Sequence, residues 1–167
     1  LAVSQIVDAD SDDIIAAGNL TYTVTFSEDI LSSTVAVGDF ALIKTGTAGG
    51  TISSVTEVAE GVFEVVVAAT GNGTIKLSVP TSASITDVAG NALGVSSAIT
   101  DGDAITVDAT APTITIDNIA TDNILNASEA SGPLVVSGTT TAEDGQIVTL
   151  GLNGKTFSGL ASGGEFS

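Results

Sequence analysis

Acidic residues crowd into a short stretch near the start of the chain, DADSDD, where Asp8, Asp10, Asp12 and Asp13 fill four of six positions. Like charges this close repel one another, so folding alone gives no reason for the cluster. Ca²⁺ takes six to eight oxygen ligands from carboxylates, carbonyls, amides and water, and a bound ion reverses the sign of the local electrostatics. The stretch therefore predicts a calcium site. Its spacing is not that of an EF-hand, because it lacks glycine at the sixth position and glutamate at the twelfth.

The alternative interpretation of this stretch is a solvated turn in which aspartates accept hydrogen bonds from nearby backbone N–H groups. Such a turn needs one or two acidic residues, whereas this stretch has four, which favours the metal site. If the backbone stays extended, alternate side chains point the same way, and Asp8, Asp10 and Asp12 would share one side.

A second oxygen-rich group lies around residue 110. We expect it to bind an ion between two domains, provided that the loop beyond residue 116 folds back toward the link. The candidate ligands before the link are Asp101, Asp103 and Asp108, and those after it are Asp122, Asn123, Asn126 and Glu129, with Asp117 beside them.

The overall charge narrows the classes of partner. Twenty acidic residues face three lysines, for a net charge of −17. Binding of DNA, RNA or anionic membrane surfaces needs Lys or Arg contacts to phosphate, so the composition argues against all three. No apolar run is long enough to cross a bilayer. A divalent cation is the simplest partner that neutralises such a chain.

The composition also argues against an enzyme. Without histidine the chain cannot form a Ser-His-Asp triad, and without cysteine it has no thiol nucleophile, thiolate metal site or disulfide. Paired carboxylates could in principle hydrolyse glycosides. However, the chain has no tryptophan to form a sugar platform, and its one tyrosine, Tyr22, is expected in the core.

The pattern of apolar residues predicts an all-β fold. In LTYTVTF, residues 20–26, apolar side chains alternate with threonines, as they do in a strand with one buried face. GTIKLSVP, from residue 73, repeats the pattern. About seven strands in about 110 residues match an immunoglobulin-like β-sandwich. The other expected strands are 2–7, 40–44, 52–58, 62–69 and 104–108, and residues 83–98 hold one helical turn at most.

A second unit is expected after Pro112, so residues 1–110 form a complete sandwich and residues 111–167 the first half of another. IVDADSDDIIAAG and IDNIATDNILNAS resemble each other at an offset of about 110 residues, which suggests tandem repeats. The expected strands are 113–119, 134–141, 147–153 and 156–160. Half a sandwich leaves one apolar face bare. We expect the natural chain to continue beyond Ser167; the alternative is that a neighbouring molecule supplies the missing strands.

Two further loops are expected to have structural roles. In TDVAGN, Asp87 with Gly90 and Asn91 should form a turn capped by the aspartate side chain. Glu28 and Asp29, in SEDI, are expected near this loop, but the sequence does not indicate a site there.

Several short segments of the sequence, taken in order, resemble the immunoglobulin-like repeats of large bacterial surface adhesins and biofilm proteins. In the first unit they are YTVTFSEDI, VGDFAL and ITDVAGNAL; in the second they are APTITIDNIATDNILNASEA, VVSGTTT and VTLGLNGKTFSG. The resemblance implies a Ca²⁺-stiffened stalk of an exported protein, with calcium held between repeats. It matches Asp108, Asp122, Asn123 and Glu129 to the interdomain ligands and gives Asp8 to Asp13 the same role toward a preceding repeat.

We therefore expect an extracellular, cell-surface extender repeat whose partners are neighbouring repeats of the same chain. The alternative is a subunit of a surface layer or filament that exchanges strands with identical subunits. A module that binds glycan or protein through its loops is a third interpretation, disfavoured because the loops carry few aromatic residues.

Overall fold

The computed structural model describes residues 1–10, 12–120 and 122–167, which form two compact units, Leu1–Thr110 (unit 1) and Ala111–Ser167 (unit 2). Strands dominate both units, so the predicted all-β class is confirmed. The helical segments among the described residues are three 3₁₀ turns: η1 (Ser32–Thr34), η2 (Val37–Asp39) and η3 (Glu129–Ser131). None of the described helices is long and apolar enough to cross a membrane.

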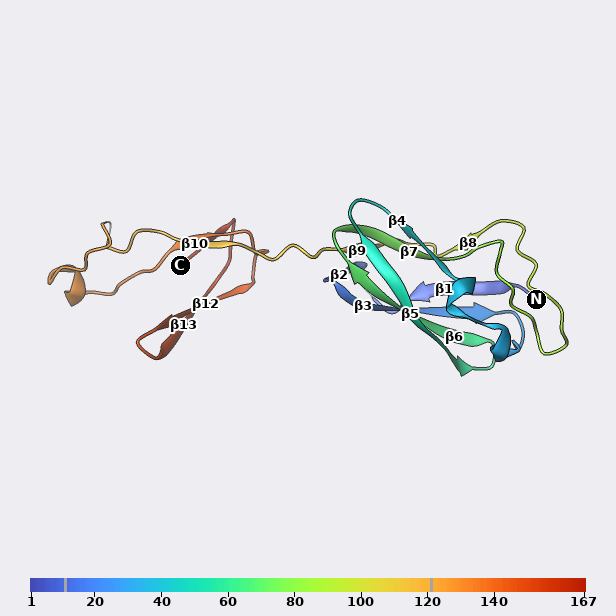
Figure 1. Cartoon of the computed structure of the whole chain (residues 1–167). Coiled ribbons are helices and arrows are strands. Elements are labelled where there is room, and N and C mark those ends of the chain that lie inside the picture. The colour runs from blue at the N-terminus through green and yellow to red at the C-terminus, as the bar shows by residue number, and fades with distance from the viewer. Residues whose placement is uncertain (11, 121) are drawn as a thin grey trace. The chain divides into compact units, whose positions relative to one another are not determined.

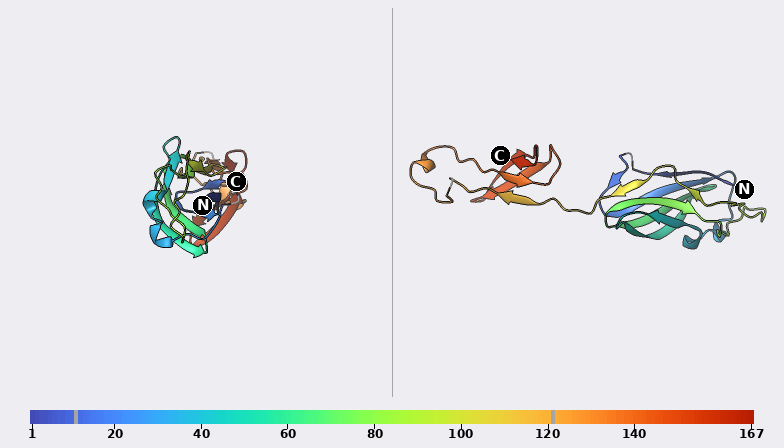
Figure 2. Two further views of the ribbon diagram at one scale, coloured as in Figure 1. Left: turned by 90° about the vertical axis from the view of Figure 1, so that its right-hand side faces the viewer. Right: turned by 90° about the horizontal axis from the view of Figure 1, so that it is seen from above.

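Unit 1 is a sandwich of two sheets (Figure 1). The first sheet has the order β1–β3–β6–β5, formed by β1 (Val3–Asp8), β3 (Gly18–Phe26), β6 (Val62–Thr70) and β5 (Gly49–Ala59). The second has the order β2–β9–β7–β4, formed by β2 (Ile14–Ile15), β9 (Ile105–Val107), β7 (Gly73–Val79) and β4 (Ala41–Lys44), with β8 (Ile99–Thr100) also paired to β7. Figure 2 shows these strands from two further directions.

The strand order of unit 1 is that of an immunoglobulin-like constant domain. Read in chain order, the two sheets correspond to strands A-B-E-D and G-F-C of that fold. The first strand is divided: β1 pairs with β3 in one sheet, and β2 runs parallel to β9 in the other. The last strand is divided as well, because β8 and β9 both pair with β7 and are separated by residues 101–104.

The core of unit 1 lies between the sheets and follows the predicted alternation. Leu20, Tyr22, Val24 and Phe26 on β3 are all buried, and so are the inward side chains of β7: Ile75, Leu77 and Val79. The rings of Phe26 and Phe63 meet edge to face, with centroids 5.7 Å apart. Burial of each of these large apolar side chains contributes roughly 1.5–3 kcal/mol, so this face of the sandwich determines the register of the strands.

Unit 2 contains two small sheets (Figure 1). One has the order β10–β11–β14, formed by β10 (Ile114–Ile116), β11 (Gly138–Thr140) and β14 (Glu165–Phe166). The other is a hairpin of β12 (Ile147–Leu152) and β13 (Lys155–Leu160). The three-stranded order repeats the β1–β3–β6 order of unit 1.

Several expected elements differ in detail. The expected strands 113–119 and 134–141 shorten to β10 and β11, because residues 117–120 and 122–137 lie outside the strands and include one 3₁₀ turn. Residues 83–98 form turns, bends and an isolated bridge between Thr86 and Ala92 without a helical turn, within the expected limit of one. The two-residue strands β2, β8 and β14 were not predicted, because two residues are too few to show an alternating pattern.

Candidate cation-binding site

The acidic loop of residues 8–13 carries the chain from one sheet of unit 1 to the other. At its start Asp8 is paired with Tyr22 of β3, and just after it Ile14 is paired with Thr106 of β9. Two side chains cap the turn: Asp8 Oδ1 accepts a hydrogen bond from the backbone N–H of Asp10 at 3.0 Å, and Asp10 Oδ1 accepts one from Asp12 at 2.9 Å. The loop ends at Asp13, whose φ of 56° is in the left-handed region.

Asp8 and Asp10 therefore each use one carboxylate oxygen to stabilise the backbone of a turn, and this use leaves the second oxygen of each side chain available to a ligand. The position of the loop does not fit the expected role toward a preceding repeat. Asp8 lies opposite the middle of β3, and the loop continues to β2, which pairs with Val107 near the end of the unit. The loop therefore lies along the side of the sandwich, away from the end at which the chain enters unit 1.

Asp101 lies directly after β8, and its side chain is buried with 5% of its surface exposed. Burial raises the pKa of the Asp101 carboxyl, and the nearby negative charge of Asp8 raises it further. Hydrogen bonds from the backbone N–H groups of Asp103 and Gly102 oppose this rise in the pKa without cancelling it. Asp101 Oδ2 is buried and receives no hydrogen bond from any described residue. Such an atom is rare in folded proteins and calls for a partner.

Tyr22 lies in the same region of the sandwich. Its hydroxyl donates a hydrogen bond to the carbonyl oxygen of Ile75 at 3.3 Å. Burial strongly raises the pKa of Tyr22, and the charges of Asp101 and Asp8 add to the effect. Asp8, Tyr22 and Asp101 thus belong to one electrostatic group, contributed by both sheets.

Asp103 is exposed, and Lys76 Nζ donates to the carbonyl oxygen of its neighbour Gly102 at 2.8 Å. Asp108 is also exposed and caps the end of unit 1, with Oδ1 accepting from the backbone N–H of Thr110 at 2.8 Å. This hydrogen bond lowers the pKa of Asp108. Asp108 thus has a local structural role as a cap.

The expected ligands in unit 2 cap turns of one loop. Asp122 Oδ1 accepts from the N–H of Ile124 at 2.9 Å, and Asn123 Oδ1 accepts from Ile119 at 2.9 Å. Asn126 and Glu129 form a reciprocal pair at the start of η3: the N–H of Asn126 donates to Glu129 Oε2 at 3.0 Å, and that of Glu129 donates to Asn126 Oδ1 at 3.1 Å. The two bonds close the turn that leads into η3, in the reciprocal manner of a capping box.

The loop that carries these residues follows β10 and precedes β11, which pair from Ile114↔Thr140 to Ile116↔Gly138. The loop therefore begins and ends at the end of this strand pair that is opposite Thr113, whereas the expected site at the junction requires it to fold back toward the link. Within residues 1–10, 12–120 and 122–167, no group of three or more acidic side chains lies close enough to form a ready-made metal site.

Two other aspartates are buried for structural reasons. Asp87 accepts hydrogen bonds from the N–H of Ala89 and from both the backbone N–H and side-chain amide of Asn91, at 2.7–2.9 Å, while Gly90 has a φ of 87°. The predicted capped turn is thus confirmed, and Glu28 lies beside it, as expected. Asp39 was not predicted; it caps η2 at Ala36 N–H and accepts a 2.7 Å bond from Ser84 N–H.

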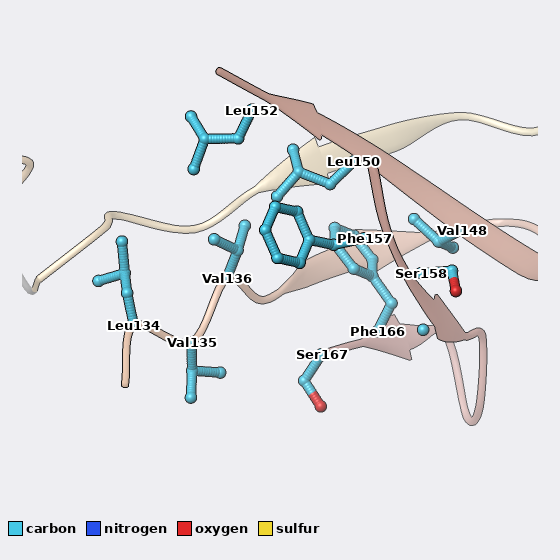
Figure 3. A pocket seen from close by; sticks show the side chains of 11 residues that line it. Leu134, Val135, Val136, Val148, Leu150, Leu152, Phe157, Ser158, Phe166 and Ser167 are labelled. Atoms are coloured by element: carbon cyan, nitrogen blue, oxygen red, sulfur yellow. The ribbon is translucent and has the colours of Figure 1, made fainter. Parts of the chain in front are cut away.

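Unit 2 carries an open apolar groove of about 480 Å³ between its two sheets. Figure 3 shows the side chains of Val136, Leu150 and Phe157 gathered around it. Phe157 remains 52% exposed, and among the described apolar side chains of unit 2 those that are buried are Ala161 and Phe166. The expected bare face of a half sandwich is therefore present.

Comparisons of this chain with protein-family models, with curated proteins and with solved structures find no match.

Proposed function

We propose that this chain is a structural spacer: a pair of successive immunoglobulin-like repeats from the stalk of an extracellular, cell-surface protein of the adhesin type. The observation that carries the proposal is the repetition of strand order, β1–β3–β6 in unit 1 and β10–β11–β14 in unit 2, across a short link that contains Pro112. Successive sandwiches joined by a short proline-stiffened link have little hinge freedom. A spacer needs this property.

Calcium completes the proposed mechanism. The chain carries a net charge of −17, and its acidic residues concentrate in the loops of residues 8–13, 101–108 and 117–129. Without a cation the carboxylates within each of these segments repel one another, which favours mobile and protease-sensitive repeats. An ion bound only in the folded state stabilises that state by mass action, and extracellular calcium is abundant enough to occupy weak sites. The many turn-capping carboxylates leave further oxygen lone pairs that an ion can use.

The test is to record small-angle scattering and thermal melting of the full chain in calcium, in magnesium and in chelator. We expect calcium to raise the melting midpoint and to narrow the distribution of end-to-end distances, and magnesium to do so less, because it demands stricter octahedral geometry. A midpoint and a distance distribution that are both insensitive to calcium would remove the ion from the mechanism.

A second candidate function is a self-assembling subunit of a surface layer or filament. The open groove of unit 2 favours it, because an apolar strand from a second copy of the chain would cover Leu150 and Phe157 and extend a sheet edge. Light scattering across a concentration series distinguishes the two functions: a subunit assembles as concentration rises, and Leu150→Asp suppresses this, whereas a stalk repeat stays monomeric.

A further inference from the structure

We propose that Asp8 and Asp101 together bind a divalent cation, best matched by Ca²⁺, inside unit 1, where the ion fastens one sheet of the sandwich to the other. This inference deepens the proposed calcium dependence and rests on it for the identity of the ion. The site differs from the expected interdomain sites in its position, because the ion lies within unit 1 and not between units.

The topology links the segments that carry the two carboxylates: Asp8 is paired with Tyr22, and the Tyr22 hydroxyl donates to Ile75 of β7, the same strand that accepts the backbone N–H of Asp101. Asp8 is the last residue of β1 in the first sheet, and Asp101 follows β8 in the second, where its backbone N–H donates to the carbonyl of Leu77 on β7 at 3.0 Å. The chain leaves each sheet's regular ladder at these points: β1 gives way to the crossing loop, and β8 is interrupted before β9. The two irregular segments place acidic side chains at the side of the sandwich.

The unpartnered oxygen of Asp101 is the observation that points to a ligand. Oδ2 is buried in a residue that is 5% exposed, and no described residue donates to it. The nearby donors are used elsewhere: the Tyr22 hydroxyl donates to Ile75, and Lys76 Nζ donates to Gly102. Neither Asp8 nor Asp101 forms an ion pair with any of the described residues. The backbone N–H groups of Asp103 and Gly102 bond to the carboxyl of Asp101 but leave Oδ2 without a donor. A buried carboxylate oxygen without a partner is unfavourable, and a bound cation relieves this.

The chemistry of the available donors selects a hard cation. The chain has no histidine or cysteine, so the donors that it offers here are oxygens. Two carboxylates from Asp8 and Asp101 form an incomplete ligand set, which water and carbonyl oxygens complete in many calcium sites. Ca²⁺ tolerates such irregular sets, whereas Mg²⁺ does not. We therefore expect weak affinity, in the range of extracellular calcium modules, roughly 10⁻⁴–10⁻³ M.

The single tyrosine of the chain offers a direct probe. Tyr22 is paired with Asp8 and lies close enough to Asp101 for their charges to interact, and the chain has no tryptophan. Tb³⁺ occupies calcium sites and emits when a nearby tyrosine is excited. Tyrosine excitation of the full chain with Tb³⁺ should therefore report an ion at this site and not at the other acidic loops, and Ca²⁺ should compete it away.

The variants are Asp101→Asn and Asp8→Asn, with Glu64→Gln on an exposed position of β6 as the control that removes one charge elsewhere. We expect both site variants to lose sensitised Tb³⁺ emission and to weaken Ca²⁺ binding at least tenfold, while Glu64→Gln keeps both. In chelator, Asp101→Asn should melt no lower than wild type, because it removes an uncompensated buried charge; this shows that the variant folds. Tyr22→Phe should abolish the emission while its calcium-dependent rise in melting midpoint remains.

Two outcomes would overturn the inference: absence of sensitised emission from wild type, or retention of wild-type emission and calcium response by Asp101→Asn. The first outcome identifies the partner of Oδ2 as a water molecule or a proton. If calcium still narrows the distance distribution in Asp101→Asn, the proposed stiffening stands and this site fails. If the site variants lose emission while calcium leaves the wild-type distance distribution unchanged, the site stands and stiffening between units fails.

Discussion

The hydroxyl of Tyr22 donates a hydrogen bond to the carbonyl oxygen of Ile75, 3.3 Å away, and so connects β3 of one sheet with β7 of the other. Both residues are fully buried. The bond is made at the centre of the sandwich, where the alternation of each strand turns one large side chain inward. This hydrogen bond therefore adds a polar contact to the apolar contacts that hold the two sheets together.

Replacement of Tyr22 by phenylalanine should keep the packing and remove this bond. The loss leaves the Ile75 carbonyl with one partner fewer in a buried position, so we expect the free energy of unfolding to fall by about 1 kcal/mol. Urea denaturation followed by far-UV circular dichroism measures the change. An unchanged unfolding free energy would mean that the bond contributes nothing net to stability.

Long strands could be predicted from the sequence because each has one buried face. LTYTVTF and GTIKLSV alternate strictly, and the structure buries Leu20, Tyr22, Ile75 and Leu77 as that pattern requires. The division of the first and last strands could not be predicted, since β2 and β8 have two residues each and depend on pairing with distant segments. Local pattern carries no information about a partner that is far along the chain.

The candidate site was predictable in composition but not in arrangement. The crowding of aspartates in DADSDD was visible, yet nothing local to that stretch showed that Asp8 would be paired with Tyr22 of the same sheet and would act electrostatically on Asp101 of the other sheet. Most other expected ligands proved to cap turns, because Asp and Asn side chains readily bond to backbone N–H groups two or three residues away. Sequence spacing alone does not separate these two uses of a carboxylate.

Asp39 should be important for the stability of unit 1. Its carboxylate accepts from the N–H of Ala36 at 2.9 Å and from the N–H of Ser84 at 2.7 Å, and so ties η2 to the loop after β7. We expect Asp39→Ala to lower the free energy of unfolding by about 2 kcal/mol, because it removes a cap and leaves buried donors unsatisfied. Chemical denaturation checks this, with exposed Glu60→Ala as the control. A loss equal to that of the control would contradict the role assigned to Asp39.

The stability of the chelated protein should depend on pH in a way that identifies Asp101. Its folded-state pKa is raised above the usual 3.8 by burial and by the charges of Asp8 and Asp103. The native state therefore takes up this proton before the unfolded chain does, and stability increases as the pH falls from neutral through the raised pKa. The pKa values of Asp87 and Asp108 are lowered by hydrogen bonds, so their contribution is present above pH 3.8 and is lost as the pH falls through their folded-state values.

We thus expect maximum stability on the acidic side of neutrality in chelator, with a steep loss below about pH 4. Asp101→Asn should reduce the increase in stability between neutral pH and the pH of maximum stability. It should leave the loss of stability below about pH 4 unchanged. Thermal melts across a pH series, with and without calcium, measure both changes in stability. Calcium should reduce the increase between neutral pH and the maximum, because a bound ion takes the place of the proton on Asp101. An identical gain in wild type and Asp101→Asn would assign it to general relief of charge repulsion instead.

Protease should cut unit 2 before unit 1. Among the described apolar side chains of unit 2, Ala161 and Phe166 are buried, whereas two strands of unit 1 alone, β6 and β7, contribute six large buried apolar side chains: Phe63, Val65, Val67, Ile75, Leu77 and Val79. A region with few buried apolar contacts opens locally at low free energy and exposes its backbone to cleavage. Brief digestion with a broad-specificity protease, followed by mass spectrometry, should yield a resistant fragment that ends near Thr110 while cuts accumulate in residues 118–136. Protection of these residues that grows with protein concentration would instead indicate that a second copy covers the groove beside Leu150 and Phe157.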